Sequence, residues 1–166
     1  MNKRAFVVCL VFVAASLPAA DSSAEEKVKT IRSRYAQIEK NLKSARQVTR
    51  DLPGESAEGG ELKAYFKDRA VEKLSATFLG ETGEAVEEYY FWNSELIFVF
   101  RVESHYTKPM SGIVKNKTEE RFYFADGKLI RWVGNGNKPV SLGAESEKRA
   151  GELQESASKY KALANK

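Results

Sequence analysis

One pattern occurs three times in this chain of 166 residues and places two aromatic residues directly before a tight turn. Each copy reads Tyr-Phe-x-Asp/Asn, then a turn residue, any residue, and Val or Leu; the copies occupy residues 65–71, 90–96 and 123–129. Aromatic residues that flank a polar two-residue turn are typical of β-hairpins, so the pattern predicts three of them. The copies start 25 and 33 residues apart, and this irregular spacing favours one antiparallel meander of about six strands over a solenoid.

The three turns differ in strength. Asp126-Gly127 is a strong signal, because both central residues of a type I′ turn have positive φ. Asn93-Ser94 is weaker, and Asp68-Arg69 is weaker still, since arginine gains nothing in that conformation. The first hairpin is therefore the least strongly specified of the three.

Helices are expected on both sides of the hairpins. Apolar residues recur every three or four positions over residues 24–50 without an intervening Gly or Pro, which predicts one long amphipathic helix. Its polar face carries five more basic than acidic residues; a solvated surface is the favoured interpretation, and contact with anionic lipid is the alternative. Residues 51–60 have the composition of a linker. Residues 144–165 predict a second helix with a stripe of small residues, which we expect to be weakly packed.

Alternation along the hairpins sorts the strand residues into two faces. One face is almost free of polar atoms and is predicted to be the core against the N-terminal helix: Phe66, Val71, Tyr89, Phe91, Leu96, Phe98, Phe100, Phe122, Phe124 and Leu129. The other face mixes charged residues with Tyr65, Leu74, Tyr90, Trp92, Ile97, Val99, Tyr123, Ile130 and Trp132. The expected fold is α+β: an antiparallel meander of about six strands packed on a long N-terminal helix, with a C-terminal helix.

The second face is a candidate binding surface. Tyrosine and tryptophan among scattered charges are what protein interfaces favour. We expect this face to be partly open, with its aromatic side chains as the binding residues: Tyr65, Tyr90, Trp92, Tyr123 and Trp132.

The first twenty residues have the pattern of a secretory signal peptide. A Lys-Arg pair precedes the uncharged apolar run 5–15, and small residues follow. The run is shorter than the ~20 apolar residues that span a bilayer, and no later stretch reaches that length. Cleavage after Ala20 or Ala24 would leave a single domain, residues 21–166, in the periplasm or outside the cell; an uncleaved anchor is the alternative.

The sequence holds no motif for catalysis, metal binding or a cofactor, such as a Gly-rich phosphate loop, a Cys/His spacing or a nucleophile elbow. His105 is the only histidine, and its neighbour Ser104 would point to the opposite face of a strand. The acidic pairs Glu87-Glu88 and Glu119-Glu120 are candidates for acid–base work, although solvated strand edges are the favoured interpretation. We therefore expect a protein that is not an enzyme and that has no metal and no cofactor.

The connection between the second and third hairpins is longer than a hairpin needs. Residues 104–117 supply donors, an aromatic ring and a flexible apolar side chain: His105, Tyr106, Lys108, Met110, Ser111 and Gly112. Long connections in small domains are often binding loops, so this one is a second candidate surface. The alternative is that the two strands extend into it.

The segments EEYYFWNSELIFVF and EERFYFADGKLIRW resemble the hairpin units of uncharacterised secreted bacterial proteins with tandem Tyr-Phe-x-Asn/Asp-Gly-Lys-Leu repeats, loosely called MORN-like. The resemblance covers residues 62–133 and implies an antiparallel β architecture in the bacterial envelope, without catalytic residues. Arg69 and Ser94 stand where such units have the turn glycine. Ser111-Gly112 also resembles the Ser-Gly loop of small periplasmic lysozyme inhibitors, although the cysteine pair frequent in those inhibitors is absent.

Several functions remain open on this basis. The favoured one is an exported, non-catalytic module that binds an unknown protein or peptide through the aromatic face or residues 104–117. The alternatives are an inhibitor of a lysozyme-like enzyme, a carrier of an apolar ligand between sheet and helix, and, least favoured, a hydrolase. Nucleic acid is not an expected partner, because export argues against it.

Overall fold

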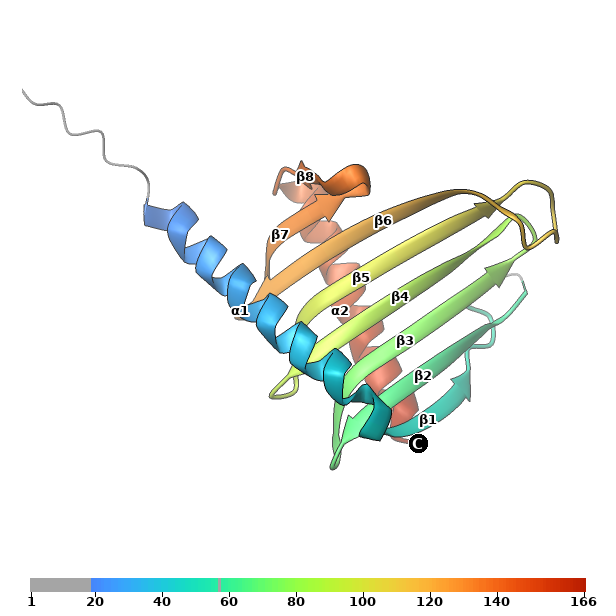
Figure 1. The fold of residues 1–166 in the computed structure, drawn as a ribbon, viewed down its shortest axis with the longest axis horizontal. Helices are drawn as coiled ribbons and strands as arrows, with labels where there is room; N and C mark the ends of the chain where they lie inside the picture. The colour runs from blue at the N-terminus through green and yellow to red at the C-terminus, as the bar shows by residue number, and fades with distance from the viewer. Residues whose placement is uncertain (1–18, 57) are drawn as a thin grey trace, which may run out of the picture.

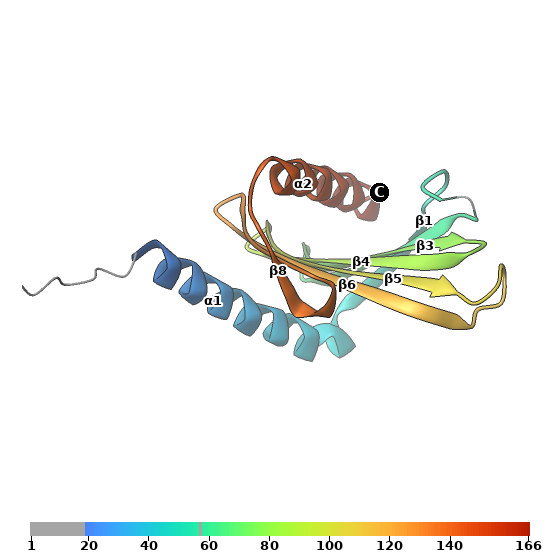
Figure 2. The ribbon, with the colours of Figure 1, turned by 90° about the horizontal axis from the view of Figure 1, so that it is seen from above.

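One antiparallel sheet lies between two helices in the computed structural model, which describes residues 19–166 except residue 57 (Figures 1 and 2). The elements follow in this order: α1 (Ala19–Asn41), the 3₁₀ turn η1 (Leu42–Ser44), β1 (Arg46–Asp51), β2 (Gly60–Lys67), β3 (Ala70–Gly80), β4 (Gly83–Trp92), β5 (Glu95–Tyr106), β6 (Val114–Ala125), β7 (Lys128–Gly134), the 3₁₀ turn η2 (Asn135–Asn137), β8 (Lys138–Val140) and α2 (Ala144–Ala164). Of the expected signal peptide, residues 1–18 lie outside the described part of the chain.

Each strand pairs antiparallel with the next strand of the chain, so the spatial order runs from β1 to β8 without a crossover. The α+β class and the antiparallel meander with an N-terminal and a C-terminal helix are confirmed. The sheet has eight strands where the sequence predicted about six. The two additional strands, β1 and β8, form the edges, and β8 contains Pro139, which an edge strand tolerates because its missing N–H leaves no gap in a ladder.

The helix predicted over residues 24–50 is wrong in its last part, because α1 ends at Asn41 and β1 follows. The apolar spacing continues to Val48, but Val48 pairs with Ala64 of β2 and packs into the core on the α2 side of the sheet. A β-branched residue suits a strand, and burial against the sheet outweighs the helical spacing. The expected linker is the loop of the β1–β2 hairpin, in which Leu52 is buried and donates its N–H to the Gly60 carbonyl at 2.9 Å.

All three copies of the repeat form hairpins. Both central residues have positive φ in the turns Asn93-Ser94 and Asp126-Gly127, as a type I′ turn requires. In the first turn only Asp68 has positive φ, and Arg69 does not. The weakest of the three turn signals therefore corresponds to the turn that departs from the shared geometry.

Each of these hairpins also carries the same irregularity. The residues beside the turns pair as the alternation predicts: Phe66 with Val71, Phe91 with Leu96, and Phe124 with Leu129. One step further from the turn the register slips by one residue, so that the repeat tyrosines Tyr65, Tyr90 and Tyr123 lie opposite Lys73, Phe98 and Arg131. The outgoing strand thus has one residue more than its partner, which defines a β-bulge.

The bulge places two consecutive residues of the outgoing strand on one face. Ile97 and Phe98 both pack on the α1 side of the sheet. Ile130 packs on the same side, and its neighbour Arg131 pairs there with Glu25 of α1. From each bulge onward, the side chains therefore lie on the face opposite to the one that uninterrupted alternation predicts.

The predicted faces are correct up to each bulge and wrong beyond it. Five residues change sides: Phe98 and Phe100 lie on the α1 face, and Leu74, Val99 and Trp132 lie on the α2 face. The Phe residues are consequently divided between both faces of the sheet instead of concentrating on one.

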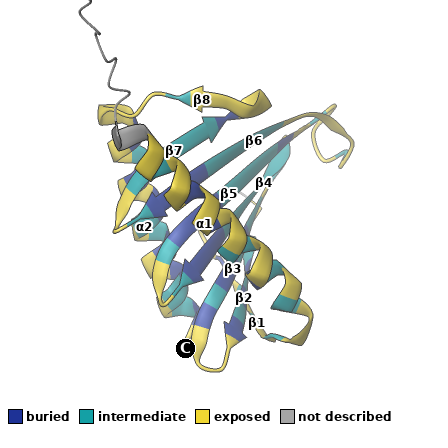
Figure 3. Ribbon diagram, turned by 60° about the vertical axis from the view of Figure 1, so that its left-hand side comes forward, coloured by how far each residue is buried: buried dark blue, intermediate teal, exposed yellow. Residues whose placement is uncertain are grey.

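Each face has its own apolar core and its own helix (Figure 2). On one side the sheet packs on α2 residues Ala150, Leu153, Ala157, Tyr160 and Ala164. On the other side it packs on α1 residues Val28, Ile31 and Ile38. Most of the Phe-rich face is therefore covered by the C-terminal helix, and the prediction that the N-terminal helix covers it is wrong. The outer side of α1 is exposed, whereas the strands beneath it are buried (Figure 3).

The C-terminal helix is also packed more tightly than its small residues suggested. Its alanine stripe is buried, and the Tyr160 ring meets the Tyr89 ring edge-on, with centroids 5.8 Å apart. Small side chains let the helix backbone approach the large rings of the sheet, so the stripe is a close-packing surface and not a weak one.

The role of α2 as a cover for this core predicts a large effect of one truncation. Leu153→Ala removes a side chain that is 1% exposed and should lower the free energy of unfolding by about 2–5 kcal/mol. Leu142→Ala, at a leucine 51% exposed just before α2, is the matched control and should change it by less than about 0.5 kcal/mol. Urea unfolding followed by circular dichroism measures both; equal effects would mean that α2 does not cover the core.

Candidate functional site

The five aromatic residues predicted as a binding face do not form one open surface. Tyr90 and Tyr123 are buried beneath α1, with 0% and 4% of their surface exposed. Trp132 lies on the other face and packs into the core beneath α2. Tyr65 and Trp92 are half-buried. Since α1 closes this face, the described structure does not offer these side chains to a partner as a set.

A buried polar cluster joins α1 to the sheet. The ammonium of Lys73, a buried residue on β3, lies 2.8 Å from Glu39 Oε1 of α1 and 2.7 Å from Glu88 Oε1 of β4. The hydroxyl of Tyr90 lies within donating distance of both carboxylates, 2.7 Å from Glu39 and 2.9 Å from Glu88. Each charged group of the cluster thereby has the hydrogen-bonded partner that a buried charge requires.

Protonation in this cluster is set well away from neutral pH. Burial raises the pKa of the Glu39 carboxyl, but hydrogen bonds from Lys73 and Tyr90 outweigh it and hold that pKa below its ordinary value. Burial lowers the pKa of Lys73, but hydrogen bonds to Glu39 and Glu88 leave it above its ordinary value. Burial and the charge of Glu88 raise the pKa of Tyr90 far above its usual range. None of these three groups is poised for general acid–base work near pH 7, so the cluster fits an anchoring role.

A second polar cluster lies on the α2 face. The Arg101 guanidinium lies 3.3 Å from Glu87, 2.8 Å from Glu103 and 3.5 Å from Glu120. Arg149 of α2 reaches Glu87 at 3.6 Å and so ties the helix to this cluster. Two guanidinium groups thus form ion pairs with three half-buried carboxylates. This arrangement holds α2 on the sheet much as the Lys73 cluster holds α1.

The acidic pairs of the sequence are split between these faces. Glu88 pairs with Lys73 on the α1 face, while Glu87 belongs to the Arg101 cluster on the α2 face. Glu120 likewise contacts Arg101, while its neighbour Glu119 turns to the other side. Neighbouring carboxylates on opposite faces of a strand cannot share one substrate, so neither pair forms an acid–base site.

His105 has few of the neighbours that catalysis would need. Its side chain is nearly half exposed, and its Nε2 lies 3.5 Å from Glu103. Ser104 is buried and points to the other face of β5, so the two side chains do not form a dyad. Among the described side chains, those of residues 22–166 apart from residue 57, no group of three or more His, Cys, Asp or Glu residues is placed to hold a metal ion.

Strand extension shortens the predicted binding loop. β5 continues to Tyr106 and β6 begins at Val114, so the loop comprises residues 107–113 and not 104–117. Of the predicted binding residues, Lys108, Met110 and Ser111 lie in the loop, while His105 and Tyr106 are part of β5.

The loop is held in place by the neighbouring β3–β4 turn. The Tyr106 N–H donates to the Thr82 carbonyl at 2.8 Å, and the Met110 N–H donates to the Glu81 carbonyl at 2.7 Å. These bonds join the two turns into one end of the sheet, which extends beyond both helices (Figures 1 and 2).

Exposed apolar side chains gather at this projecting end. Four of the five large exposed hydrophobic residues in the described chain lie there, and we call them the tip patch: Leu79, Met110, Ile113 and Val114. Met110 and Ile113 are 68% and 65% exposed. Single exposed apolar residues are ordinary, but a cluster at one end of a molecule is a candidate interaction surface.

Next to the tip patch, β6 has an edge without a strand partner. β6 pairs with β5 from Val114 to Tyr123, whereas β7 pairs with β6 only from Arg121 onward. Among the described strands, residues 114–120 thus have a neighbour on one side only; we call this segment the free edge. From Asn116 onward, half of its backbone N–H and C=O groups face away from β5, as in a regular antiparallel strand; Lys115 has no partner on β5, because the register slips by one residue there.

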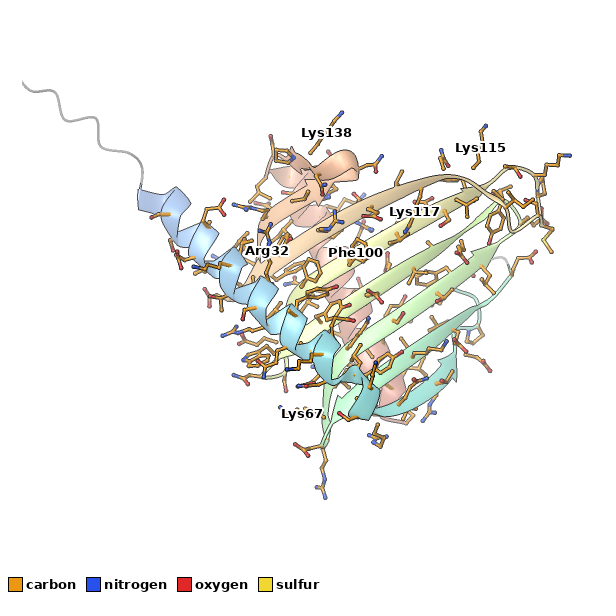
Figure 4. The ribbon with its side chains drawn as sticks, in the orientation of Figure 1. Arg32, Lys67, Phe100, Lys115, Lys117 and Lys138 are labelled. Atoms are coloured by element: carbon orange, nitrogen blue, oxygen red, sulfur yellow. The ribbon has the colours of Figure 1, made fainter. Side chains whose placement is uncertain are left out.

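Lysines surround the free edge. Lys115 and Lys117 project from it, and Lys138 lies at the start of β8 (Figure 4). Lys117 pairs with Glu119 at 3.4 Å, but Lys108, Lys115 and Lys138 make no ion pair with any described residue. The free edge as a whole holds two lysines and two glutamates, and Lys115 is its cation without an ion-pair partner among the described residues.

Comparison of this chain with known protein families, with characterised proteins and with solved structures finds no match. Among the described helices, none is long and apolar enough to cross a membrane.

The anchoring role of Lys73 predicts a stability effect that depends on pH. Lys73→Met leaves the partly exposed carboxylates of Glu39 and Glu88 without a cation and should lower the free energy of unfolding by about 1–3 kcal/mol at pH 7, less than the loss of a fully buried pair. Because the folded-state pKa of Glu39 is lowered, its contribution is present above the ordinary value of 4.5 and is lost as the pH falls through the folded value. The difference in free energy of unfolding between the variant and the wild type, measured by urea titration, should therefore be smaller at pH 3 than at pH 7.

Lys63→Met is the matched control, since Lys63 makes an exposed ion pair with Glu61 and exposed pairs contribute little. A Lys73→Met loss of the same size at both pH values would show that packing of the lysine stem, and not its charge, holds α1.

Proposed function

We propose that this chain is a non-catalytic, exported module that binds another protein through the projecting end of its sheet. This proposal rests on the tip patch, the free edge and the unpaired lysines Lys108 and Lys115, which lie together there, outside both helices. Protein interfaces favour a central apolar contact with charges around it, and this arrangement has both. Export is supported by the pattern of residues 1–20, and cleavage after Ala20 or Ala24 leaves Glu25 and its contact with Arg131 in place.

The binding mode we propose is addition of a partner strand to the free edge. An extended peptide that pairs with residues 114–120 would satisfy the backbone groups that face away from β5. Lys108, Lys115 and Lys138 favour a partner segment with acidic side chains, since they have no counter-charge among the described residues. Apolar side chains of the partner would meet Ile113 and Val114 at the tip.

The alternatives draw less support from the geometry. A hydrolase would need a nucleophile beside His105, and Ser104 lies on the opposite face of the strand. A lysozyme inhibitor would use Ser111, but the Ser111 hydroxyl already accepts the Ile113 N–H at 3.3 Å and lies 3.4 Å from the Thr107 hydroxyl. The protruding position of the loop suits either a general partner or an enzyme cleft, so an inhibitor is one form of the proposed module.

Photo-crosslinking in the native host tests the position of this surface. A benzophenone amino acid at Met110 or Val114 should crosslink to one protein of the exported fraction. The same group at Leu142, the fifth exposed hydrophobic residue and distant from the tip in the chain, is the matched control and should not. Absence of crosslinks at Met110 and Val114, or equal crosslinking at Leu142, would contradict the proposal.

Charge reversal then tests the binding mode with the purified partner. Lys115→Glu combined with Lys117→Glu should slow association by about tenfold or more at low salt, because steering by the edge charge is lost. The difference should shrink as ionic strength rises. Lys148→Glu, at an exposed lysine of α2, is the control and should leave the rate close to that of the wild type. If the double variant bound as fast as the wild type, the partner would not be an acidic strand on this edge.

A further inference from the structure

A pocket of about 190 Å³ opens between α1 and strands β5 and β6, on the side of α1 that faces the projecting end. It is lined by three residues of α1, two of β5 and two of β6: Ile31, Arg32, Tyr35, Phe98, Phe100, Arg121 and Tyr123. Arg32 and Phe100 mark its two walls in Figure 4. This pocket plays no part in the proposed contact at the tip.

Aromatic rings form the floor of the pocket. The Phe98 ring lies 4.9 Å from the Tyr123 ring and 5.3 Å from the Tyr35 ring, measured between centroids. Phe100 is half-buried at the mouth. A volume of this size suits one aromatic ring, since an apolar cavity of about 150 Å³ holds benzene.

Two guanidinium groups stand over this floor. The Cζ of Arg32 lies 5.7 Å from the centroid of Tyr123, and the Cζ of Arg121 lies 5.1 Å from the centroid of Phe100. A guanidinium stacked on a ring keeps its N–H groups in the plane, where they can bind a carboxylate. Each wall of the pocket therefore carries one guanidinium group.

The two arginines differ in what already holds them. Arg121 donates to Glu119 at 2.7 Å and to Asn137 at 3.0 Å, so its position is fixed. Arg32 makes no hydrogen bond to any described residue, although its charge helps to lower the pKa of Glu25, whose own hydrogen bonds come from Arg131. Arg32 is thus an available donor at the mouth of the pocket.

The opposite side of α1 provides an internal comparison. A second opening there, of about 260 Å³, is lined by three carboxylates and two cations: Glu26, Glu95, Asp126, Lys27 and Arg34. The lining of the first pocket has two arginines and no carboxylate. The same helix thus has an opening with two arginines on one side and an opening with three carboxylates on the other. Four aromatic residues line the first, whereas Phe124 is the aromatic residue of the second.

We infer that the pocket between α1 and strands β5 and β6 binds a small anion with one aromatic ring, of the class of aromatic carboxylates. The ring lies on Phe98, Phe100 and Tyr123, and the carboxylate lies between Arg32 and Arg121. This ligand differs from the apolar cargo that the sequence suggested for a carrier, because each wall carries a guanidinium group.

Benzoate is the probe that tests this inference, with the full protein as purified from its host and binding followed by calorimetry or NMR titration. Benzoate should bind saturably at one site. Benzyl alcohol, which keeps the ring and loses the charge, and acetate, which keeps the charge and loses the ring, should each bind at least about tenfold more weakly, the factor that one charge-assisted hydrogen bond accounts for.

Variants of single arginines distinguish binding in this pocket from non-specific attraction of benzoate to a positively charged surface. Arg32→Gln should weaken the binding of benzoate by about tenfold. Arg121→Lys keeps the positive charge but loses the planar guanidinium, and it should weaken the binding by a smaller factor. Arg34→Gln is the matched control, since Arg34 stacks on Trp92 at 5.3 Å on the other side of the same helix, and it should leave benzoate affinity unchanged. No saturable binding of benzoate, equal binding of benzyl alcohol, or equal loss with Arg34→Gln would each overturn the inference.

Discussion

The bulge that follows each hairpin turn determines how the rest of this molecule is built. One extra residue in each of three outgoing strands turns Phe98 and Arg131 toward α1 and Val99 and Trp132 toward α2. Without the bulges, strict alternation would give one Phe-rich face and one face on which Tyr and Trp are mixed with charged residues, and one helix would suffice to cover the Phe-rich side. With them, both faces are aromatic near the turns, and each face needs a helix of its own.

The two helices are tied to the sheet by charges as well as by apolar contact. The segment Glu87-Glu88-Tyr89-Tyr90 contributes to both ties, because alternation sends one glutamate and one tyrosine to each face. On one face Glu88 and Tyr90 meet Lys73 and α1, and on the other Glu87 meets Arg101 and Arg149 of α2. Buried ion pairs add little net stability compared with apolar packing, but an unpaired buried charge is costly. Such clusters therefore disfavour every docking position of the helices except the one that pairs them.

Local signals in the sequence are sufficient to predict the hairpins, but they do not predict which face of the sheet each side chain lies on. The Asp126-Gly127 turn and the aromatic pairs depend on neighbours in the chain, so sequence reasoning found them. No glycine or proline marks the bulges, whose extra residues are Glu72, Ile97 and Ile130, and so the slip in register left no sequence signal. The end of α1 was missed for a similar reason: Val48 fits a helical stripe, and only its contact with the sheet makes it a strand residue.

The candidate surfaces also differ in whether local sequence or contacts between distant segments determine them. The loop near Met110 was found because its length and composition are local properties, whereas the exposure of Tyr90 and Tyr123 depends on where α1 docks. The pocket with Arg32 and Arg121 joins residues about ninety positions apart in the chain, and nothing local to either arginine indicates it.

The length of the strands explains why an uncovered end exists at all. β5 and β6 have twelve residues each and so reach about 40 Å, while a helix that crosses them covers a band only about 10 Å wide. The halves near the turns carry the aromatic residues and are covered; the far halves carry charges and extend beyond both helices. A long free edge invites unwanted strand pairing, and lysines such as Lys115 and Lys117 are a common protection against it. The same lysines would repel a second copy of this edge and attract an acidic strand, so protection against aggregation and selection of a partner need only one set of charges.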